Sequence, residues 1–187
     1  MKSAPPPWIQ SVAVFGSSQP GPESLEYALA REVGSTLAAA GYSVVTGGYG
    51  GVMEGASRGA QESGGSALGV LTEIFSDRRP NPYLTEQLHS EDLYGRTREL
   101  IDACDAYVVL PGQTGTLAEL TWVWALRRAG CLPLRPVIVL GESWRLLIEM
   151  LRRQGVMDSN AVEMTVCIDQ LSELIPVLAD WPRPPAQ

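Results

Sequence analysis

The stretch LPGQTGTLAEL, residues 110–120, combines the residue types from which anion-binding sites are commonly built. It follows the apolar run AYVVL and contains Gly112, Gly115, two threonines and a single carboxylate, Glu119. Glycines let the backbone turn with its N–H groups pointing outward, and a helix starting near Thr116 adds the positive end of its dipole. We therefore expect this loop to bind an anion, and a phosphate monoester fits best.

Thr116 and Glu119 also fit a purely structural arrangement. The pattern Thr-x-x-Glu is a capping box, in which both side chains only satisfy N–H groups at a helix start. Two more segments favour a binding site, because GSSQPGP from Gly16 and GGYGGVME from Gly47 also follow apolar runs. GGYGG is not a GxGxxG fingerprint and follows the second predicted strand, which argues against an ordinary NAD site.

Short valine-rich runs alternate with helical patterns along the chain. The runs predict buried parallel strands at 11–15, 42–46, 66–71, 106–110 and 136–140, with a weaker strand at 163–168. Helices are expected at 22–40, 51–63, 92–103, 116–129, 143–154 and 169–179. This alternation predicts an α/β fold with a doubly wound, mostly parallel sheet in three αβα layers. The strands at 11–15 and 106–110 then become neighbours at the switch point, and the three loops meet at their carboxyl ends, where ligands bind.

The domain organisation is expected to be simple. The 187 residues are 45% hydrophobic, which is enough for one sizeable core. We expect one Rossmann-like nucleotide-binding domain over residues 11–180, between a disordered N-terminal tail at 1–10 and a C-terminal tail at 181–187. The stretch 72–92 has no clear pattern, and its length indicates an excursion over the binding edge.

Charge and hydropathy exclude several partner classes. A net charge of -7 and a pI near 4.7 provide no basic surface for nucleic acid or an anionic membrane. No apolar run reaches the ~20 residues of a membrane helix, and MKSAPPPW has neither the apolar core nor the cleavage site of a signal peptide. We expect a cytoplasmic protein.

The scarcity of lysine, histidine and cysteine excludes several reaction classes. Lys2, the only lysine, lies in the predicted tail, which removes P-loop and Schiff-base chemistry. His89 is the only histidine and has no glycine-flanked nucleophile to serve, so we interpret it as a surface residue. No metal site or cofactor is predicted. The three dispersed cysteines indicate small core residues: Cys104, Cys131 and Cys167.

Taken together, the motifs resemble the Lonely Guy (LOG) family, also labelled lysine decarboxylase-like. Its characterised members are nucleoside 5'-monophosphate phosphoribohydrolases with a modified Rossmann fold. The family's PGGxGTxxE motif appears as PGQTGTLAE, residues 111–119, and its RKxxM element appears as RTREL, with Arg96 at the arginine position. The resemblance covers roughly residues 11–180. The decarboxylase label fails, because no lysine is available for pyridoxal phosphate.

The resemblance implies a set of site residues. It places catalytic roles on Arg96 and Glu119. It places substrate contacts on Gly16, Ser17, Ser18, Gly47, Gly48, Met53, Gly112, Gln113, Thr114, Gly115 and Thr116. It also implies a homodimer, and the aromatic and leucine content of TLAELTWVWALRRAG independently favours a second buried face on that helix, with Trp122 outside the main apolar stripe.

Departures from the family pattern leave two functions open. Gln113 replaces a glycine of the motif, Thr97 replaces a lysine, and GGVME is one residue shorter than the usual hydrolase loop. The shorter loop is similar to that of molybdenum-cofactor carrier proteins in the same superfamily. The candidates are a hydrolase that releases the base from an AMP-like nucleotide, and a non-catalytic carrier of a nucleotide or a phosphorylated, molybdopterin-like cofactor.

Hydrolysis of an N-glycosidic bond requires an anchored 5'-phosphate, a carboxylate near the ribose and a donor that steadies the substrate. The PGQTGT loop, Glu119 and Arg96 could supply these in turn. Arg96 also fits a role outside any site, as a solvated helix charge paired with Glu99 or Asp92. Glu54 is a second carboxylate or a first-turn helix acid, and Tyr49 stacks on a base or packs in the core.

Overall fold

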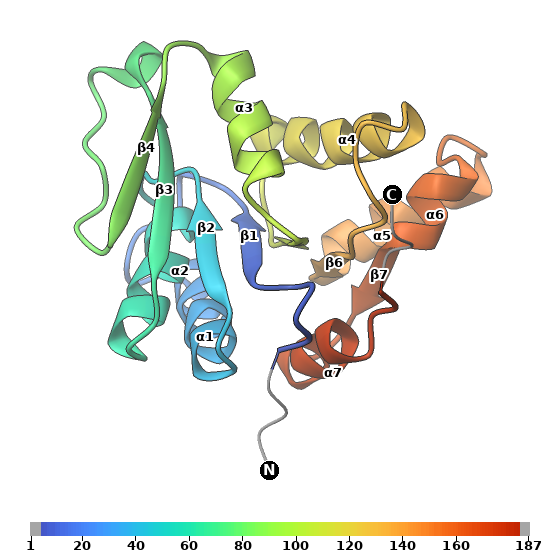
Figure 1. Ribbon diagram of the computed structural model, residues 1–187, viewed down its shortest axis with the longest axis horizontal. Helices are drawn as coiled ribbons and strands as arrows, with labels where there is room; N and C mark the ends of the chain where they lie inside the picture. Colours follow the sequence, from blue (N-terminus) through green and yellow to red (C-terminus); the bar gives the residue numbers. More distant parts are fainter. Residues whose placement is uncertain (1–4, 184–187) are drawn as a thin grey trace.

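The computed structural model describes residues 5–183 and contains one seven-stranded sheet (Figure 1). All strand pairs are parallel, in the order β4-β3-β2-β1-β5-β6-β7. The strands are β1 (Ser11–Phe15), β2 (Ser43–Thr46), β3 (Ala67–Thr72), β4 (Glu86–Ser90), β5 (Ala106–Val109), β6 (Val137–Leu140) and β7 (Thr165–Ile168). The helices are α1 (Leu25–Ala39), α2 (Val52–Glu62), α3 (Leu93–Asp102), α4 (Thr114–Arg128), α5 (Glu142–Arg153), α6 (Ser159–Met164) and α7 (Leu174–Ala179), with short 3-10 turns at Glu73–Phe75 and Leu171–Glu173.

Helices cover both faces of the sheet. On one face α1, α2 and α7 pack on alternate strand residues such as Val12 and Val44, and on the other α3, α4, α5 and α6 pack on the intervening ones, such as Ala13 and Val45. Neighbouring residues of one strand face opposite sides, and both sides are buried, which is why the strands are continuous apolar runs. The predicted three-layer α/β fold with β1 beside β5 at the switch point is confirmed.

The region 72–92 differs from the expectation of an unstructured excursion. It contains the 3-10 turn at Glu73–Phe75 and the edge strand β4, paired with β3. The sequence EQLHS of β4 lacks the apolar signal because four of its five residues are exposed, as an edge strand allows. His89 lies in this strand and is exposed, as predicted. The helix α6 was also not predicted.

The predictions for the cysteines and for the N-terminal tail are wrong in part. Cys104 is buried as expected, but Cys131 is exposed beyond the end of α4, and Cys167 is only half-buried. The expected N-terminal tail also includes residues that join the core: Ile9 is 1% exposed, and Trp8 packs against the same cluster. Lys2 lies outside the described residues. Within residues 5–183, no helix combines the length and apolar character needed to cross a bilayer.

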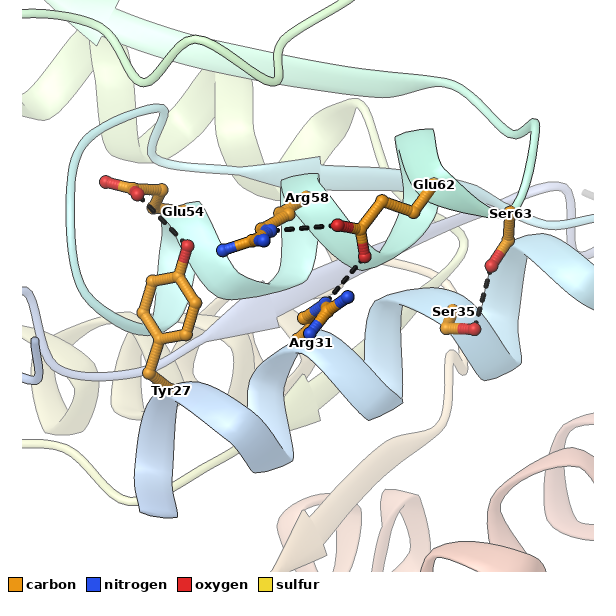
Figure 2. A network of polar contacts seen from close by, with 7 residues as sticks. All are labelled: Tyr27, Arg31, Ser35, Glu54, Arg58, Glu62 and Ser63. Carbon is orange, nitrogen blue, oxygen red and sulfur yellow. Dashed lines mark hydrogen bonds and ion pairs between the residues drawn. The ribbon is translucent and has the colours of Figure 1, made fainter. Parts of the chain in front are cut away.

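The pair α1 and α2 is packed closely enough to require glycine. A Cβ at Gly34 would fall on the carbonyl oxygen of Ala56, and one at Gly59 would fall on that of Arg31. A polar network runs along the same seam (Figure 2), in which Glu62 accepts from Arg31 and Arg58 at 2.6 and 2.9 Å. The backbone of α2 is thereby fixed against α1.

The same seam continues toward the switch point. The Tyr27 hydroxyl donates to Glu54 at 3.0 Å, and Ser35 and Ser63 share a hydrogen bond of 2.7 Å at the other end (Figure 2). Glu54 is thus a first-turn acid of α2, the second of its two predicted roles. The start of α2 holds the loop after β1, because the Val52 N–H donates to the Ser17 carbonyl at 2.9 Å.

We expect Gly34→Ala to destabilise the protein by about 1–3 kcal/mol, the usual effect of overpacking, although alanine is intrinsically the better helix former by about 1 kcal/mol. Urea unfolding would measure the change. Gly21→Ala is the matched control, because a Cβ at Gly21 meets no atom within 4 Å. Equal midpoints for the two variants would show that the helices can separate without loss.

Candidate active site

A cavity of about 300 Å³ lies outside the carboxyl ends of the central strands. Its walls come from the loops after β1, β2, β3 and β5 and from the N-terminal parts of α2, α3 and α4. The lining residues are Gly16, Ser17, Ser18, Tyr49, Met53, Phe75, Arg78, Leu93, Tyr94, Arg96, Thr97, Gln113, Gly115, Thr116, Ala118, Glu119 and Trp122. Its volume is at the lower end of the range for small-molecule sites.

The helix α4 begins two residues earlier than predicted. Its N-cap is Gln113, whose side chain caps no N–H group, and Thr114 to Thr116 form the first turn. The first N–H groups of a helix have no intrahelical partner, so this end can bind an anion. The capping box is absent, because Thr116 is a buried third residue of the helix and not its N-cap.

We expected the two glycines of PGQTGT to let the backbone turn. Neither has a positive φ, so each has another role. A Cβ at Gly112 would fall on the side chain of Thr116, so this position must stay small for the loop to close on the helix. A Cβ at Gly115 meets nothing within 4 Å, although the residue lines the cavity. Gly115 therefore keeps space open in front of the helix start.

The loop after β1 is tied to its neighbours on both sides. The Ser17 N–H donates to the Pro111 carbonyl at 3.2 Å, and its own carbonyl accepts from Val52. Gly51, with φ of 71°, lies against the backbone of Ser17 and Ser18, where a side chain would collide. The serine loop and the start of α4 are thus held as adjoining walls of the cavity.

Arg96 is buried, with 6% of its surface exposed. Its Nε donates to the Val70 carbonyl at 2.8 Å, and its Nη2 donates to the Gly47 carbonyl at 3.0 Å. The guanidinium lies over the rings of Tyr49 and Phe75, 5.7 and 5.9 Å from their centroids. The alternative of a solvated helix charge is therefore wrong.

Arg96 lines the cavity, and the two carbonyls use only part of its donor capacity. Burial lowers the pKa of Arg96, while the nearby Glu119 opposes this change. A fixed guanidinium of this kind can bind an anion or a carbonyl edge of a ligand.

Glu119 lies in the second turn of α4 and faces the same cavity. Burial raises the pKa of its carboxyl to about 7, and Arg96 acts in the opposite direction. Within residues 5–183, Glu119 forms no ion pair closer than 4 Å, although Arg96 is near enough to influence it. The carboxylate and the guanidinium therefore line the same cavity without a direct ion pair between them.

Most of the predicted site residues are brought together. Those that line the cavity are Gly16, Ser17, Ser18, Met53, Arg96, Gln113, Gly115, Thr116 and Glu119. The four others, Gly47, Gly48, Gly112 and Thr114, are not in the lining. Gly47 has a supporting role, since a Cβ there would fall on the Nη2 of Arg96. Gly48 forms the turn after β2, with φ of 78°.

Several lining residues were not predicted. Phe75 and Arg78 come from the stretch that we expected to pass over the binding edge, and that expectation was the only signal for them. Tyr49 packs, with its hydroxyl bonded to the backbone of Thr72 at 3.0 and 3.1 Å, and also borders the cavity. Leu93, Tyr94 and Trp122 complete the rim, and no local pattern marks them as a group.

The arrangement combines a helix start whose N-cap side chain caps no N–H group, a carboxylate whose pKa is raised by burial to about 7, and a fixed guanidinium. A carboxylate with such a pKa is suited to proton transfer or to stabilising positive charge. No cluster of histidine, cysteine, aspartate or glutamate in the described part of the chain has the spacing to hold a metal ion.

A profile of the SLOG cluster4 family matches residues 10–166. The chain is 30% identical over 178 residues to a cytokinin riboside 5'-monophosphate phosphoribohydrolase of Mycobacterium marinum, covering 90% of this chain and 93% of that protein. It is 29% identical over 174 residues to the enzyme of the same name from Mycobacterium tuberculosis, covering 88% and 91%.

Among solved structures, the molybdenum cofactor binding protein of Rippkaea orientalis matches with a TM-score of 0.72. The identity is 22%, and the match covers 90% of this chain and 94% of that one. At this identity the likeness shows a shared fold.

We expect Gly115→Val to abolish binding of AMP and inorganic phosphate without unfolding the protein. Valine fits a helix at least as well as glycine, but its side chain would fill the space in front of the free N–H groups. Calorimetric titration would measure binding. Ala125→Val, an exposed substitution farther along α4, is the control. Unchanged affinity, or a nucleotide bound elsewhere with this loop closed on itself, would contradict the assignment.

Proposed function

The chain belongs to the SLOG cluster4 family, and from this premise we propose that it is a cytoplasmic phosphoribohydrolase. The proposed substrate is an AMP-like nucleoside 5'-monophosphate, and the products are the free base and ribose 5-phosphate. The observation that carries the proposal is one cavity shared by the start of α4, Glu119 and Arg96. The relatives named as phosphoribohydrolases support hydrolysis at the level of the family.

The proposed reaction uses these groups in a fixed order. The 5'-phosphate binds the N–H groups of Thr114 to Thr116, which places the ribose along α4 toward Glu119. As the bond to the base breaks, positive charge develops on the ribose, and the ionised carboxylate stabilises it and orients a water molecule. Water gives its hydroxyl to the anomeric carbon, and its proton balances the charge on the departing base. Arg96 acts as a fixed donor that steadies the substrate.

A second candidate is a carrier that binds a phosphorylated ligand without cleaving it. Gln113 favours this function, because it introduces a side chain at the mouth of the anion site, where the family motif has glycine. The uncharged Thr97 beside Arg96 favours it as well. Both functions use the same cavity, so turnover distinguishes them.

We expect Glu119→Gln to bind AMP, while its rate of adenine release falls by about a hundredfold or more, the scale of losing a positioned carboxylate. Arg96→Ala should weaken binding, because the substrate loses a fixed donor. The measurement is free adenine released from AMP by wild type and both variants under one set of conditions. No release by folded wild type from any purine monophosphate would discard the hydrolase in favour of the carrier.

The pH profile provides the control for the role of Glu119. Since the ionised carboxylate is the active form in this mechanism, kcat/KM should rise with pH as Glu119 loses its proton, with a midpoint near 7. The second ionisation of the substrate phosphate, near pH 6, acts in the same direction but belongs to the substrate. Glu119→Gln should therefore lose the upper step and keep the lower one.

A homodimer through α4 is also part of the proposal. Leu120, Val123 and Trp124 bury one face of this helix in the core, while Trp122 remains 46% exposed on another. Tyr94, 79% exposed, lies with Trp122 at the rim of the same cavity. Large aromatic side chains exposed together are typical of a protein interface.

Light scattering at micromolar concentration should report a dimer, and Trp122→Glu should convert it to a monomer by placing a charge in the buried contact. Leu25→Glu is the control, because Leu25 is 86% exposed on α1, on the opposite face of the sheet. A monomeric wild type, or an equal effect of both substitutions, would contradict an interface on α4.

A further inference from the structure

A second arginine, Arg78, faces the cavity from a different part of the chain. It follows the 3-10 turn at Glu73–Phe75, and its backbone N–H donates to the Phe75 carbonyl at 2.8 Å. Its guanidinium lies over the Phe75 ring, 4.5 Å from the centroid. Arg96 approaches the same ring at 5.9 Å, so one aromatic side chain contacts both guanidinium groups.

Arg78 and Arg96 differ from five other arginines, which form ion pairs with carboxylates. The ion pairs of the described part of the chain involve Arg31, Arg58, Arg98, Arg128 and Arg145. Neither Arg78 nor Arg96 takes part in these pairs, and among the residues that the structure describes Glu119 is the only acidic one in the cavity lining. Arg78 is close enough to Arg96 for their like charges to contribute to the lowered pKa of Arg96.

Two positive charges at one cavity with a single carboxylate leave an excess of positive charge there. The dipole of α4 adds to this excess, because its positive end opens on the same space. Thr97, the lining residue next to Arg96, carries no charge, so the second cation is supplied by the loop after β3. Such a field favours a ligand with two negative charges over one with a single charge.

The geometry also separates the roles of the two arginines. Two backbone carbonyls hold the guanidinium of Arg96. Arg78 is exposed, and its guanidinium donates no hydrogen bond within residues 5–183. Its side-chain N–H groups are therefore available to donate to a ligand. A planar fork of this kind pairs well with two phosphate oxygens.

We propose that Arg78 is a second ligand-binding arginine, and that with Arg96 it makes the cavity select the dianion of a phosphate monoester over a singly charged or uncharged analogue. This inference rests on the proposed function for the identity of the ligand. It assigns the charge specificity of the site to the loop between β3 and β4.

The test compares three probes that differ in charge: AMP, the methyl ester of its 5'-phosphate, which is a monoanion, and adenosine. Dissociation constants are measured by calorimetry, with Glu119→Gln present in every protein so that AMP is not consumed. Arg78→Met keeps an apolar stem over Phe75 but removes the charge. Arg79→Met removes the adjacent arginine, which does not line the cavity, and is the matched control.

We expect Arg78→Met to weaken AMP binding by about tenfold or more, the scale of a hydrogen bond to a charged group, and to change adenosine binding by less than about twofold. The preference for AMP over its methyl ester should fall with it, since the lost interaction is strongest with the dianion. Arg78→Lys should recover part of the affinity. Arg79→Met should leave all three constants unchanged within about twofold, as expected for an exposed charge.

Two results would overturn the inference. Equal weakening of AMP and adenosine by Arg78→Met would show that Arg78 only holds the loop through Phe75. An unchanged constant for AMP would show that its charge does not reach the ligand. Because the readout is binding, the inference can fail while wild type releases adenine, and it can hold while wild type releases none.

Discussion

One buried guanidinium organises the carboxyl edge of the sheet. Removing Arg96 from water is costly, and the cost is offset by two backbone carbonyls, two aromatic faces and the carboxylate of Glu119. These contacts tie α3 to β3 and to the turn after β2. They also explain why residue 47 is glycine, since any side chain there would displace the guanidinium. The site therefore has an arginine whose position is set by the backbone around it.

The remaining walls depend on close backbone packing. The loop after β1 is held between the Pro111 carbonyl and the start of α2, and α2 is in turn held against α1 by glycine contacts and the network around Glu62. Glycine is required where backbones touch along this path, at Gly34, Gly51 and Gly59. A site on such a scaffold is prearranged, and a ligand has little ordering free energy to supply on binding.

The helix α4 contributes both to the cavity and to the exposed surface of the molecule. Its first turn offers free N–H groups, its second turn carries Glu119, and its exposed side carries Trp122. The raised pKa of Glu119 is a consequence of placing a carboxylate in a partly desolvated cavity, where Arg96 compensates only in part. Binding an anionic ligand beside it would favour the protonated carboxyl further, so the placement of positive charge around the cavity matters for any reaction there. Arg78 and Arg96 are the positive side chains in position to do this.

The sequence by itself determined the layer architecture, the switch point between β1 and β5 and the position of the glycine-rich PGQTGT loop at the carboxyl edge of the sheet. Those features depend on local periodicity and on glycines next to apolar runs, which are readable along the chain. It did not reveal β4, whose exposed residues carry no apolar signal, or the true start of α4, where a capping-box pattern suited a helix two residues later. Only the tertiary structure decided that Arg96 is buried, that Gly115 leaves open space in front of the start of α4 and that Arg78 lines the same cavity as Arg96. The reason is physical: burial, clearance and the meeting of charges depend on segments distant in sequence, which are brought together only by the packing of the sheet and its helices.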